Sequence, residues 1–356
     1  MDFLIATDDL HECRFAEQPA PELQPGQALL RVERFGLSAN NITYAKFGEA
    51  MSYWSFFPAE DGWGRMPVWG FAEVAESEVE QLAPGTRVYG YLPPSSELLV
   101  QPVRVDARGF VDASPHRASL PAAYNGYATV AEDPIYTPDT EELQMLLRPL
   151  FFTSFLIDDF LAEASLFGAS SVVLSSASSK TANGLAFLLS RREGIEVIGL
   201  TSARSLDFTN SLGVYDRVVT YGEIESLADT PAVYVDMAGD AEVRNQVHGH
   251  FGAALTHSAV VGATHHDRMG AVPDSLPGPP PTFFFAPDRV AKRSTEWGRE
   301  GFEARVAEAW GPYAHWCAGW LGVIEASGPE PLHEAYLDLL DGRADPAKAH
   351  VLSLPR

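Results

Sequence analysis

Cysteine and basic residues are both scarce in this sequence. The two cysteines among 356 residues, Cys13 and Cys317, lie far apart, so the pattern supports neither a disulfide framework nor a cysteine-based zinc site. Lysine and arginine together number 25 against 48 aspartates and glutamates, which gives a net charge of -23. Because a negative field repels phosphate backbones and anionic headgroups, we expect neither nucleic acid nor a membrane surface as a partner.

Long apolar runs are also missing. No stretch reaches the roughly 18 apolar residues that a membrane helix needs. The residues from Met1 to Asp9 carry acidic side chains where a secretory signal would carry basic ones. The sequence is nevertheless 46% hydrophobic and long enough for two cores, so we expect a cytoplasmic protein of two folded domains.

The first 110 residues or so have the pattern of a β-rich domain. The dipeptides Pro25-Gly26 and Pro84-Gly85 predict turns, and each precedes a short run of β type, over residues 28–34 and 86–92. Residues 71–75 continue the same pattern. We therefore expect several short strands joined by turns.

The pattern changes near residue 140 to strands that alternate with helices. Residues 141–163 predict a long helix, which Pro149 should interrupt. The strands that follow are expected over residues 171–175, 196–200, 217–220, 232–236 and 258–262, with a last strand at 283–285. Strands separated by helical segments imply right-handed βαβ units and a parallel sheet. Two more helices, over 299–320 and 331–340, precede a final strand at 350–354.

This order of elements resembles the medium-chain dehydrogenase/reductase superfamily. The motifs that carry the resemblance are Pro25-Gly26 with the strand after it, Pro67-Val68-Trp69-Gly70, Pro84-Gly85-Thr86-Arg87-Val88, and His333-Glu334-Ala335-Tyr336 with the closing Val351-Leu352. Within the superfamily the chain looks most like a divergent branch named DUF2855, with quinone oxidoreductases as the nearest characterised relatives. The resemblance implies an α/β fold: a GroES-like β-rich catalytic domain over residues 1–147, a Rossmann-type doubly wound parallel-sheet domain over 148–286, and a C-terminal segment, 287–356, that returns to the catalytic domain.

The zinc ligands of that superfamily are absent here. Ser38 and Trp69 stand where the resemblance would place the catalytic cysteine and histidine, and the run of structural-zinc cysteines is missing. Zinc requires Cys, His or carboxylate ligands in a tetrahedral set. We therefore expect a zinc-independent protein without a metal site, and we interpret the neighbouring histidines His265 and His266 as solvated loop residues.

The turn after the first strand of the parallel sheet lacks the glycines of a dinucleotide-binding motif. Small serines still permit close approach, and their hydroxyls, the helix N-terminus and a lysine can hold phosphate. The candidates for this role are Ser176, Ser178, Ser179, Lys180 and Thr181. The alternative is an ordinary serine N-cap beside an exposed lysine.

The end of the second strand favours NADP over NAD. NAD-selective proteins carry an acidic residue there to hold the ribose, whereas this chain has Thr201 and Arg204, which suit a 2′-phosphate. The resemblance places Tyr221 beside the same phosphate, and Gly262 and Thr153 near the nicotinamide. The alternatives are a solvated arginine at Arg204 and a hydroxyl at Thr153 that bonds back to its own helix.

Proton donors and orienting groups are expected in an inter-domain cleft. The candidates in the first domain are Asn41, Tyr44, Tyr124 and Asn125, although buried Tyr and Asn often only satisfy loop backbone. Lys292, next to Arg293 and followed by Trp297, Trp310, Trp316 and Trp320, is a candidate for binding a substrate carboxylate. The alternative is that these tryptophans pack the helix.

The sequence thus predicts an NADP(H)-dependent, zinc-independent oxidoreductase that acts on an α,β-unsaturated carbonyl, a quinone or a similar small substrate. A non-redox lyase or isomerase on a degenerate scaffold, or a non-catalytic binding protein, is the alternative. We also expect a homodimer, because Phe283, Phe284 and Phe285 at a sheet edge would promote aggregation if they stayed uncovered.

Overall fold

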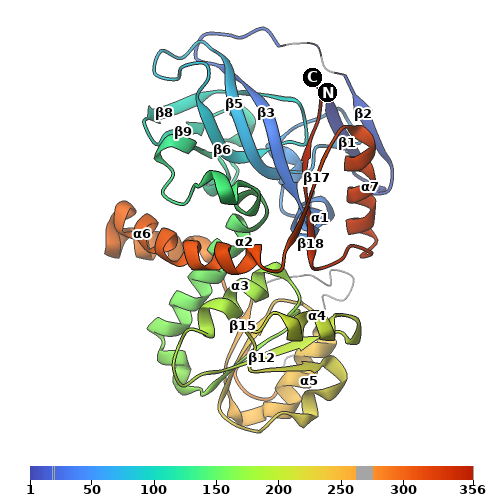
Figure 1. The fold of residues 1–356 in the computed structure, drawn as a ribbon, viewed down its shortest axis with the longest axis vertical. Coiled ribbons are helices and arrows are strands. Elements are labelled where there is room, and N and C mark those ends of the chain that lie inside the picture. The colour runs from blue at the N-terminus through green and yellow to red at the C-terminus, as the bar shows by residue number, and fades with distance from the viewer. Residues whose placement is uncertain (18, 20, 262–275, 356) are drawn as a thin grey trace. The chain divides into compact units, whose positions relative to one another are not determined.

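The computed structural model describes residues 1–17, 19, 21–261 and 276–355. The chain divides into two compact units. One consists of Met1–Leu146 together with Leu321–Arg356, and the other is Leu147–Trp320. We call these the first and the second unit (Figure 1).

The first unit is built from two sheets. A three-stranded sheet has the order β2 (Cys13–Ala16), β1 (Asp2–Ala6), β4 (Trp63–Gly64). The larger sheet has the order β17 (Gly322–Ser327), β18 (Lys348–Ser353), β3 (Ala28–Leu37), β5 (Val68–Ser77), β6 (Arg87–Leu92), β10 (Gly126–Thr129), β9 (Gly109–Asp112), β8 (Pro102–Asp106), while β7 (Glu97–Val100) also pairs with β3. Two helices, α1 (Ala39–Lys46) and α7 (Pro329–Leu340), complete the unit.

The β-rich pattern predicted for the start of the chain is confirmed. The strands expected at 28–34, 71–75 and 86–92 lie side by side as β3, β5 and β6, all antiparallel. The chain end returns to them, because β18 pairs with β3 through His350 and Leu37. Its parallel neighbour β17 has no counterpart among the predicted strands; most of its side chains are exposed, so it lacks the apolar pattern of a buried strand.

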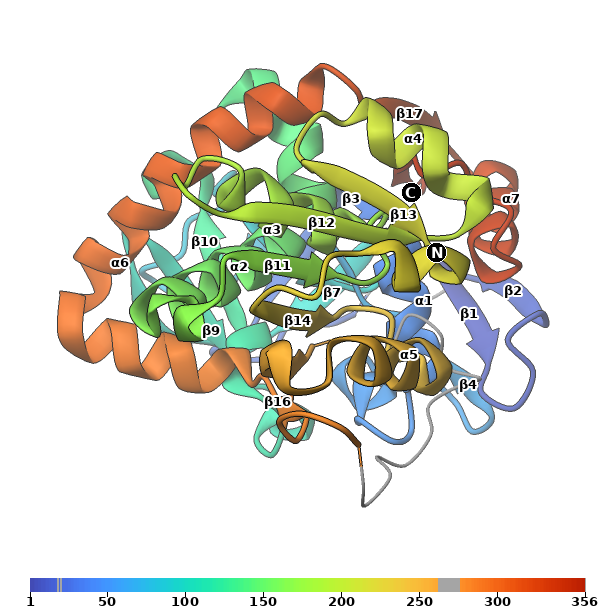
Figure 2. The same ribbon diagram turned by 90° about the horizontal axis from the view of Figure 1, so that it is seen from below.

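The second unit contains the expected parallel sheet. Its order is β13 (Arg217–Thr220), β12 (Glu196–Thr201), β11 (Ser171–Leu174), β14 (Ala232–Asp236), β15 (Leu255–Val260), β16 (Thr282–Phe283). All five pairings are parallel, and the order reverses between β11 and β14 (Figure 2). This is the doubly wound Rossmann topology, in which ligands bind at the carboxyl ends of the strands beside the reversal. The helices α3 (Lys180–Leu189), α4 (Leu206–Ser211) and α5 (Ala241–Phe251) connect the strands.

Helix α2 (Glu141–Glu163) has the bounds that the sequence predicts, but the expected interruption at Pro149 is wrong. Helical backbone continues through the proline. Proline removes one backbone hydrogen bond from a helix. Packing offsets that loss here, because Leu147, Phe151 and Leu156 on the turns around it are fully buried or nearly so.

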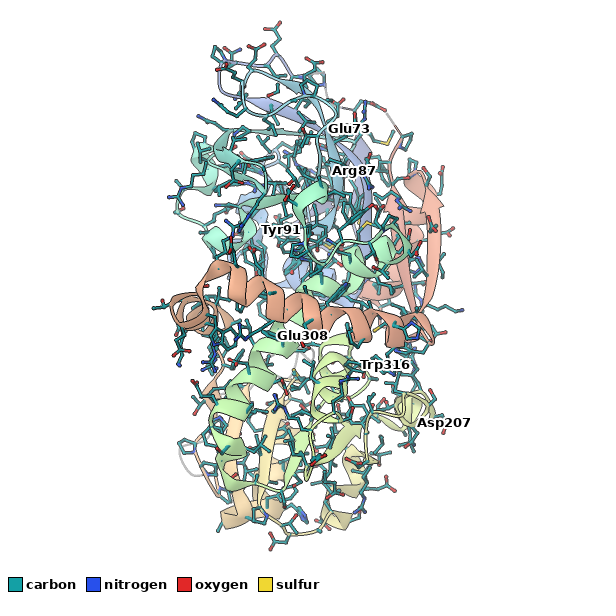
Figure 3. The ribbon with its side chains drawn as sticks, turned by 60° about the vertical axis from the view of Figure 1, so that its left-hand side comes forward. Glu73, Arg87, Tyr91, Asp207, Glu308 and Trp316 are labelled. Atoms are coloured by element: carbon teal, nitrogen blue, oxygen red, sulfur yellow. The ribbon has the colours of Figure 1, made fainter. Side chains whose placement is uncertain are left out.

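Helix α6 (Ala286–Ala318) consists of two helical segments that meet at Gly298, where φ is 70° and ψ is 165°. Its second segment packs on the rest of the second unit through tryptophan. Trp310 lies 5.5 Å from Phe151 between ring centroids, and Trp316 lies 5.2 Å from Phe187 (Figure 3). Trp310 and Trp316 therefore pack this helix onto α2 and α3 of the second unit. No helix in the described part of the chain is long and apolar enough to cross a membrane.

Candidate functional site

The carboxyl ends of β11 and β14 are joined by a buried serine. The Ser175 hydroxyl donates to Asp236 Oδ1 at 3.0 Å and accepts from the amides of Met237 and Ala238, each at 3.0 Å. Asp236 Oδ1 also accepts from the Gly239 amide at 2.9 Å. Burial raises the pKa of Asp236, against the effect of these hydrogen bonds. The Asp236-to-Gly239 motif thus fixes the two strand ends beside the topological reversal.

Ser176 occupies the position where a glycine would be expected in the turn. Its φ is 51°, in the left-handed region that L-residues other than Asn and Asp rarely adopt. The Ser176 amide donates to the Tyr221 hydroxyl at 3.1 Å. Burial raises the pKa of Tyr221 to about 12, so the phenol stays neutral. Two predicted cofactor residues are therefore brought together, although they are 45 positions apart.

Tyr215 and Gly199, which the sequence analysis did not single out, hold the same turn. The Tyr215 hydroxyl donates to the Ala177 carbonyl at 2.8 Å. Gly199 in β12 lies directly beside the turn: a Cβ there would stand 2.9 Å from the Cβ of Ala177 and 3.0 Å from the Tyr215 ring. A glycine inside a predicted strand indicates close approach of other chain, and that signal was available in the sequence.

Ser179 is the N-cap of α3, and its hydroxyl accepts from the Ala182 amide at 3.3 Å. Ser175 and Ala177 are buried, whereas Ser176, Ser178 and the first residues of α3, Lys180 and Thr181, are partly exposed. The accessible side of the turn is therefore the side that carries hydroxyls, an ammonium group and a helix N-terminus. This donor set suits an anion.

Thr201 and Arg204 lie at the end of β12, next to the serine turn in the sheet order. Thr201 is buried as the last residue of the strand, and Arg204 is exposed in the short helical turn Ala203–Ser205. Thr153 in α2 donates to the Pro149 carbonyl at 3.3 Å, which is the back-bonded arrangement considered for it. Its neighbour Ser154 reaches α3 instead, donating to the Thr181 carbonyl at 2.7 Å. Gly262, His265, His266 and Asp267 lie outside the described residues.

In the first unit, Asn41 has a structural role at the start of α1. Its Oδ1 accepts from the Ser38 amide at 2.8 Å, and its Nδ2 donates to the Pro67 carbonyl at 3.0 Å. Ser38 is the N-cap of the same helix. The amide of Asn41 therefore uses both its ends on the protein, which favours the structural interpretation over a catalytic one.

Tyr44 and Tyr124 belong to one aromatic cluster, which we define as Tyr44, Tyr53, Trp69, Tyr91 and Tyr124. Ring centroids are 4.7 Å apart for Tyr44 and Tyr53, and also for Tyr91 and Tyr124. Trp69 lies 4.9 Å from Tyr91 and 6.1 Å from Tyr124. The Tyr44 hydroxyl accepts from Asn40 at 2.9 Å, and burial raises its pKa well above the usual range. The position that the resemblance assigns to a zinc ligand is therefore part of an aromatic cluster.

The first unit also contains a buried ion pair that no sequence pattern predicts. Arg117 Nε is 3.2 Å from Asp112 Oδ2, and both side chains are 1% exposed. The guanidinium also stacks on Phe57 at 4.7 Å. Asn125, a predicted site residue, is buried, and its Oδ1 has no hydrogen-bond partner among the described residues.

Lys292 is part of an ion network instead of an open cationic site. Its ammonium is 2.7 Å from Glu163 and is paired with Glu296 as well, and these bonds raise its pKa. Arg293 is bound to Asp159 at 2.7 Å. Because both charges are already compensated by carboxylates, the network favours helix packing over binding of a substrate anion.

The described residues contain no group of three His, Cys, Asp or Glu side chains that could hold a metal ion. Two arrangements remain that could act on a small molecule: the turn with hydroxyls and amides after β11, and the cluster of neutral phenols in the first unit. The turn can bind an anion, and phenol hydroxyls can donate a hydrogen bond or a proton to a developing oxyanion.

Comparison with known proteins supports this architecture. A family model described as "Protein of unknown function (DUF2855)" matches residues 35–345. A search of curated proteins finds no match. Solved structures with the same fold include CurA from Vibrio vulnificus in complex with NADPH, with 13% identity and a TM-score of 0.56 over 97% of this chain and 94% of that chain.

Two further structures match at similar levels. The YhdH oxidoreductase from Salmonella enterica in complex with NADP has 15% identity and a TM-score of 0.55, covering 99% of both chains. The CurK enoyl reductase has 14% identity and a TM-score of 0.52, also covering 99% of both chains. At sequence identities this low, the structural similarity shows a shared fold alone. The predicted two-part dehydrogenase/reductase fold is thereby confirmed.

Proposed function

This chain belongs to the family described as "Protein of unknown function (DUF2855)", and we propose that it is a zinc-independent oxidoreductase that uses NADP(H) to reduce an α,β-unsaturated carbonyl, a quinone or a similar small substrate. The observation that carries the proposal is the turn after β11. It lies beside the reversal of the strand order, and its partly exposed residues are Ser176, Ser178 and Lys180. Proteins of the same fold have been crystallised with NADPH or NADP.

The residues of the turn fit a dinucleotide phosphate despite the missing glycines. The turn lies close to β12 because Gly199 has no side chain, and Tyr215 and Tyr221 hold it in place. In this proposal Ser178, Lys180 and the N-terminal amides of α3 bind the pyrophosphate. Arg204, at the end of the neighbouring strand, would bind the 2′-phosphate that distinguishes NADP from NAD.

When bound, NADPH would supply a hydride to an electron-poor carbon. The protein's own contribution in this proposal is to hold the substrate and to protonate the enolate or quinolate that forms. Tyr44 is the candidate proton donor, because its phenol is protonated at neutral pH and Asn40 orients its oxygen. Trp69 and Tyr124 offer flat surfaces for a planar conjugated substrate.

The first test is titration of the purified protein with NADPH and NADH, followed by nicotinamide fluorescence and thermal shift. We expect binding of both, with NADPH preferred. Arg204→Ala should weaken the binding of NADPH by about tenfold or more, because a charge-assisted hydrogen bond contributes roughly 1.5–3 kcal/mol. The same change should leave the affinity for NADH unchanged. Arg191→Ala is the matched control, because Arg191 is exposed at the opposite end of α3.

Absence of binding by either dinucleotide to a folded sample would overturn the redox proposal. The protein would then be assayed as a lyase or isomerase, or as a binding protein. An equal loss of NADPH affinity in Arg204→Ala and Arg191→Ala would leave the cofactor in place but contradict the role of Arg204.

A further inference from the structure

The second unit contains a pocket that the proposed reaction does not use. It has a volume of about 180 Å³ and is formed by α2, β15, β16 and the start of α6. Its walls are mostly aromatic, and a few polar groups face it. The residues that line it include Phe160, His257, Thr282, Phe283, Phe285 and Arg289.

His257 is the central polar group of this pocket. Its Nε2 is buried and has no hydrogen-bond partner among the described residues. Burial lowers the pKa of His257, so the ring is neutral at neutral pH and one of its nitrogens needs a donor. Arg289 also has a buried polar atom without a hydrogen-bond partner among the described residues. Its terminal nitrogens pair with Asp159 and Glu163, whereas its buried Nε has no partner in the described chain.

The backbone beside the pocket is held in an unusual conformation that fixes the His257 ring. Ser165, Leu166 and Phe167 have consecutive φ values of 48°, 51° and 52°, although none is glycine. Left-handed backbone is unfavourable for each of these residues. The turn places the Phe167 ring 4.0 Å from His257 and within 5° of parallel. The Phe160 ring centroid lies 5.6 Å from the ring centroids of both Phe167 and His257.

We propose that this pocket is a binding site for a small planar aromatic molecule that carries a hydroxyl group, a phenol in chemical class. The walls match a flat ring, and a space of this order holds a single aromatic ring. A phenolic hydroxyl both donates and accepts. It can therefore form a hydrogen bond with His257 Nε2 whether that nitrogen donates or accepts. Its oxygen can also accept a hydrogen bond from the Nε of Arg289.

The site is separate from the serine turn. In the sheet order β16 lies three strands from β11, which at about 4.8 Å per strand is about 14 Å (Figure 2). The proposal does not rest on the nature of the reaction, and occupancy of one site is not expected to exclude the other.

Phenol is the test ligand, with toluene as a probe of the same shape that lacks the hydroxyl. Binding to the full chain is measured by calorimetry and by saturation-transfer NMR. We expect phenol to bind about fivefold more tightly than toluene, since a hydrogen bond contributes about 1 kcal/mol. His257→Phe keeps the stacking on Phe167 and should lower this preference to what the Arg289 Nε alone supplies. Thr282→Phe, at an exposed position of the pocket rim, should block both ligands.

His315→Phe, an exposed histidine on α6, is the matched control and should bind phenol as the wild type does. Phenol affinity should also be the same with and without saturating NADPH. The proposal is overturned if phenol does not bind, if His257→Phe keeps the full preference for phenol over toluene, or if Thr282→Phe leaves binding unchanged. Displacement of phenol by NADPH would show that the ligand occupies the dinucleotide site instead.

Discussion

At the scale of single residues, the turn after β11 shows that the glycine needed for a close approach can lie on the neighbouring strand. The turn itself contains serines, and Ser176 adopts a left-handed backbone without being glycine. The close approach between the turn and β12 depends on Gly199, which lies on the neighbouring strand. A search of the sequence for glycines in the turn alone therefore misses the feature that lets the turn approach the sheet.

Gly199→Ala should destabilise the protein and weaken NADPH binding. The added methyl group would lie 2.9 Å from the Cβ of Ala177, and overpacking of this kind costs about 1–3 kcal/mol. Thermal unfolding and NADPH titration measure the two effects. Combining the change with Ala177→Gly should restore part of both, because it removes the opposing methyl group.

Gly249→Ala in α5 is the control for this experiment, since a Cβ there meets no atom within 4 Å. It should leave NADPH binding intact and raise stability slightly, as alanine favours helix over glycine. If Gly199→Ala bound NADPH like the wild type, the turn would have to tolerate displacement, and its proposed role as a rigid phosphate site would fail.

At the scale of elements, α2 is anchored to the sheet of the first unit by one carboxylate. Glu141 in its first turn accepts from Arg87 at 2.6 Å and is also bound by Arg34 and by Tyr136 at 2.8 Å. Burial alone would raise the pKa of Glu141, but these bonds outweigh it and lower the pKa to about 2. The negative charge also lies favourably at a helix N-terminus.

This anchor predicts a specific pH dependence of stability. A carboxylate whose pKa is lower in the folded state than its ordinary 4.5 stabilises the fold above that value, and the contribution is lost as the pH falls towards 2. Glu141→Gln should lower the melting temperature at neutral pH. It should also make the melting temperature fall less steeply as the pH is lowered towards 2. Glu80→Gln, which removes an exposed carboxylate from the same unit, should do neither. An equally steep fall in Glu141→Gln would refute this assignment.

Elements and side-chain roles differ in how well the sequence predicts them. Buried strands such as β11 and β14 are continuous apolar runs, and their period and length are local properties that the sequence displays. The pairing of Lys292 with Glu163 joins residues 129 positions apart, and the buried contact of Arg117 with Asp112 depends on tertiary packing. Ser176 was predicted from its place in the turn after the first strand, whereas only the family resemblance supplied Tyr221.

At the scale of the whole molecule, the exposed edge of the parallel sheet predicts association. Phe283 and Phe285 are 65% and 51% exposed, and β16 has only β15 beside it among the described strands. An open apolar edge strand is a site for pairing with another chain. We expect a homodimer in which β16 edges pair.

Light scattering after size-exclusion chromatography measures the mass directly. The wild type should elute at the mass of two chains, and Phe283→Asp should shift it to one, because a charge in the interface would lose its hydration without a partner. Met51→Asp introduces the same charge at a residue of the first unit that is 54% exposed, and it should leave the mass unchanged. A wild type with the mass of one chain would mean that the exposed rings of Phe283 and Phe285 stay uncovered in solution. A two-chain mass that survives Phe283→Asp would place the interface on another surface of the protein.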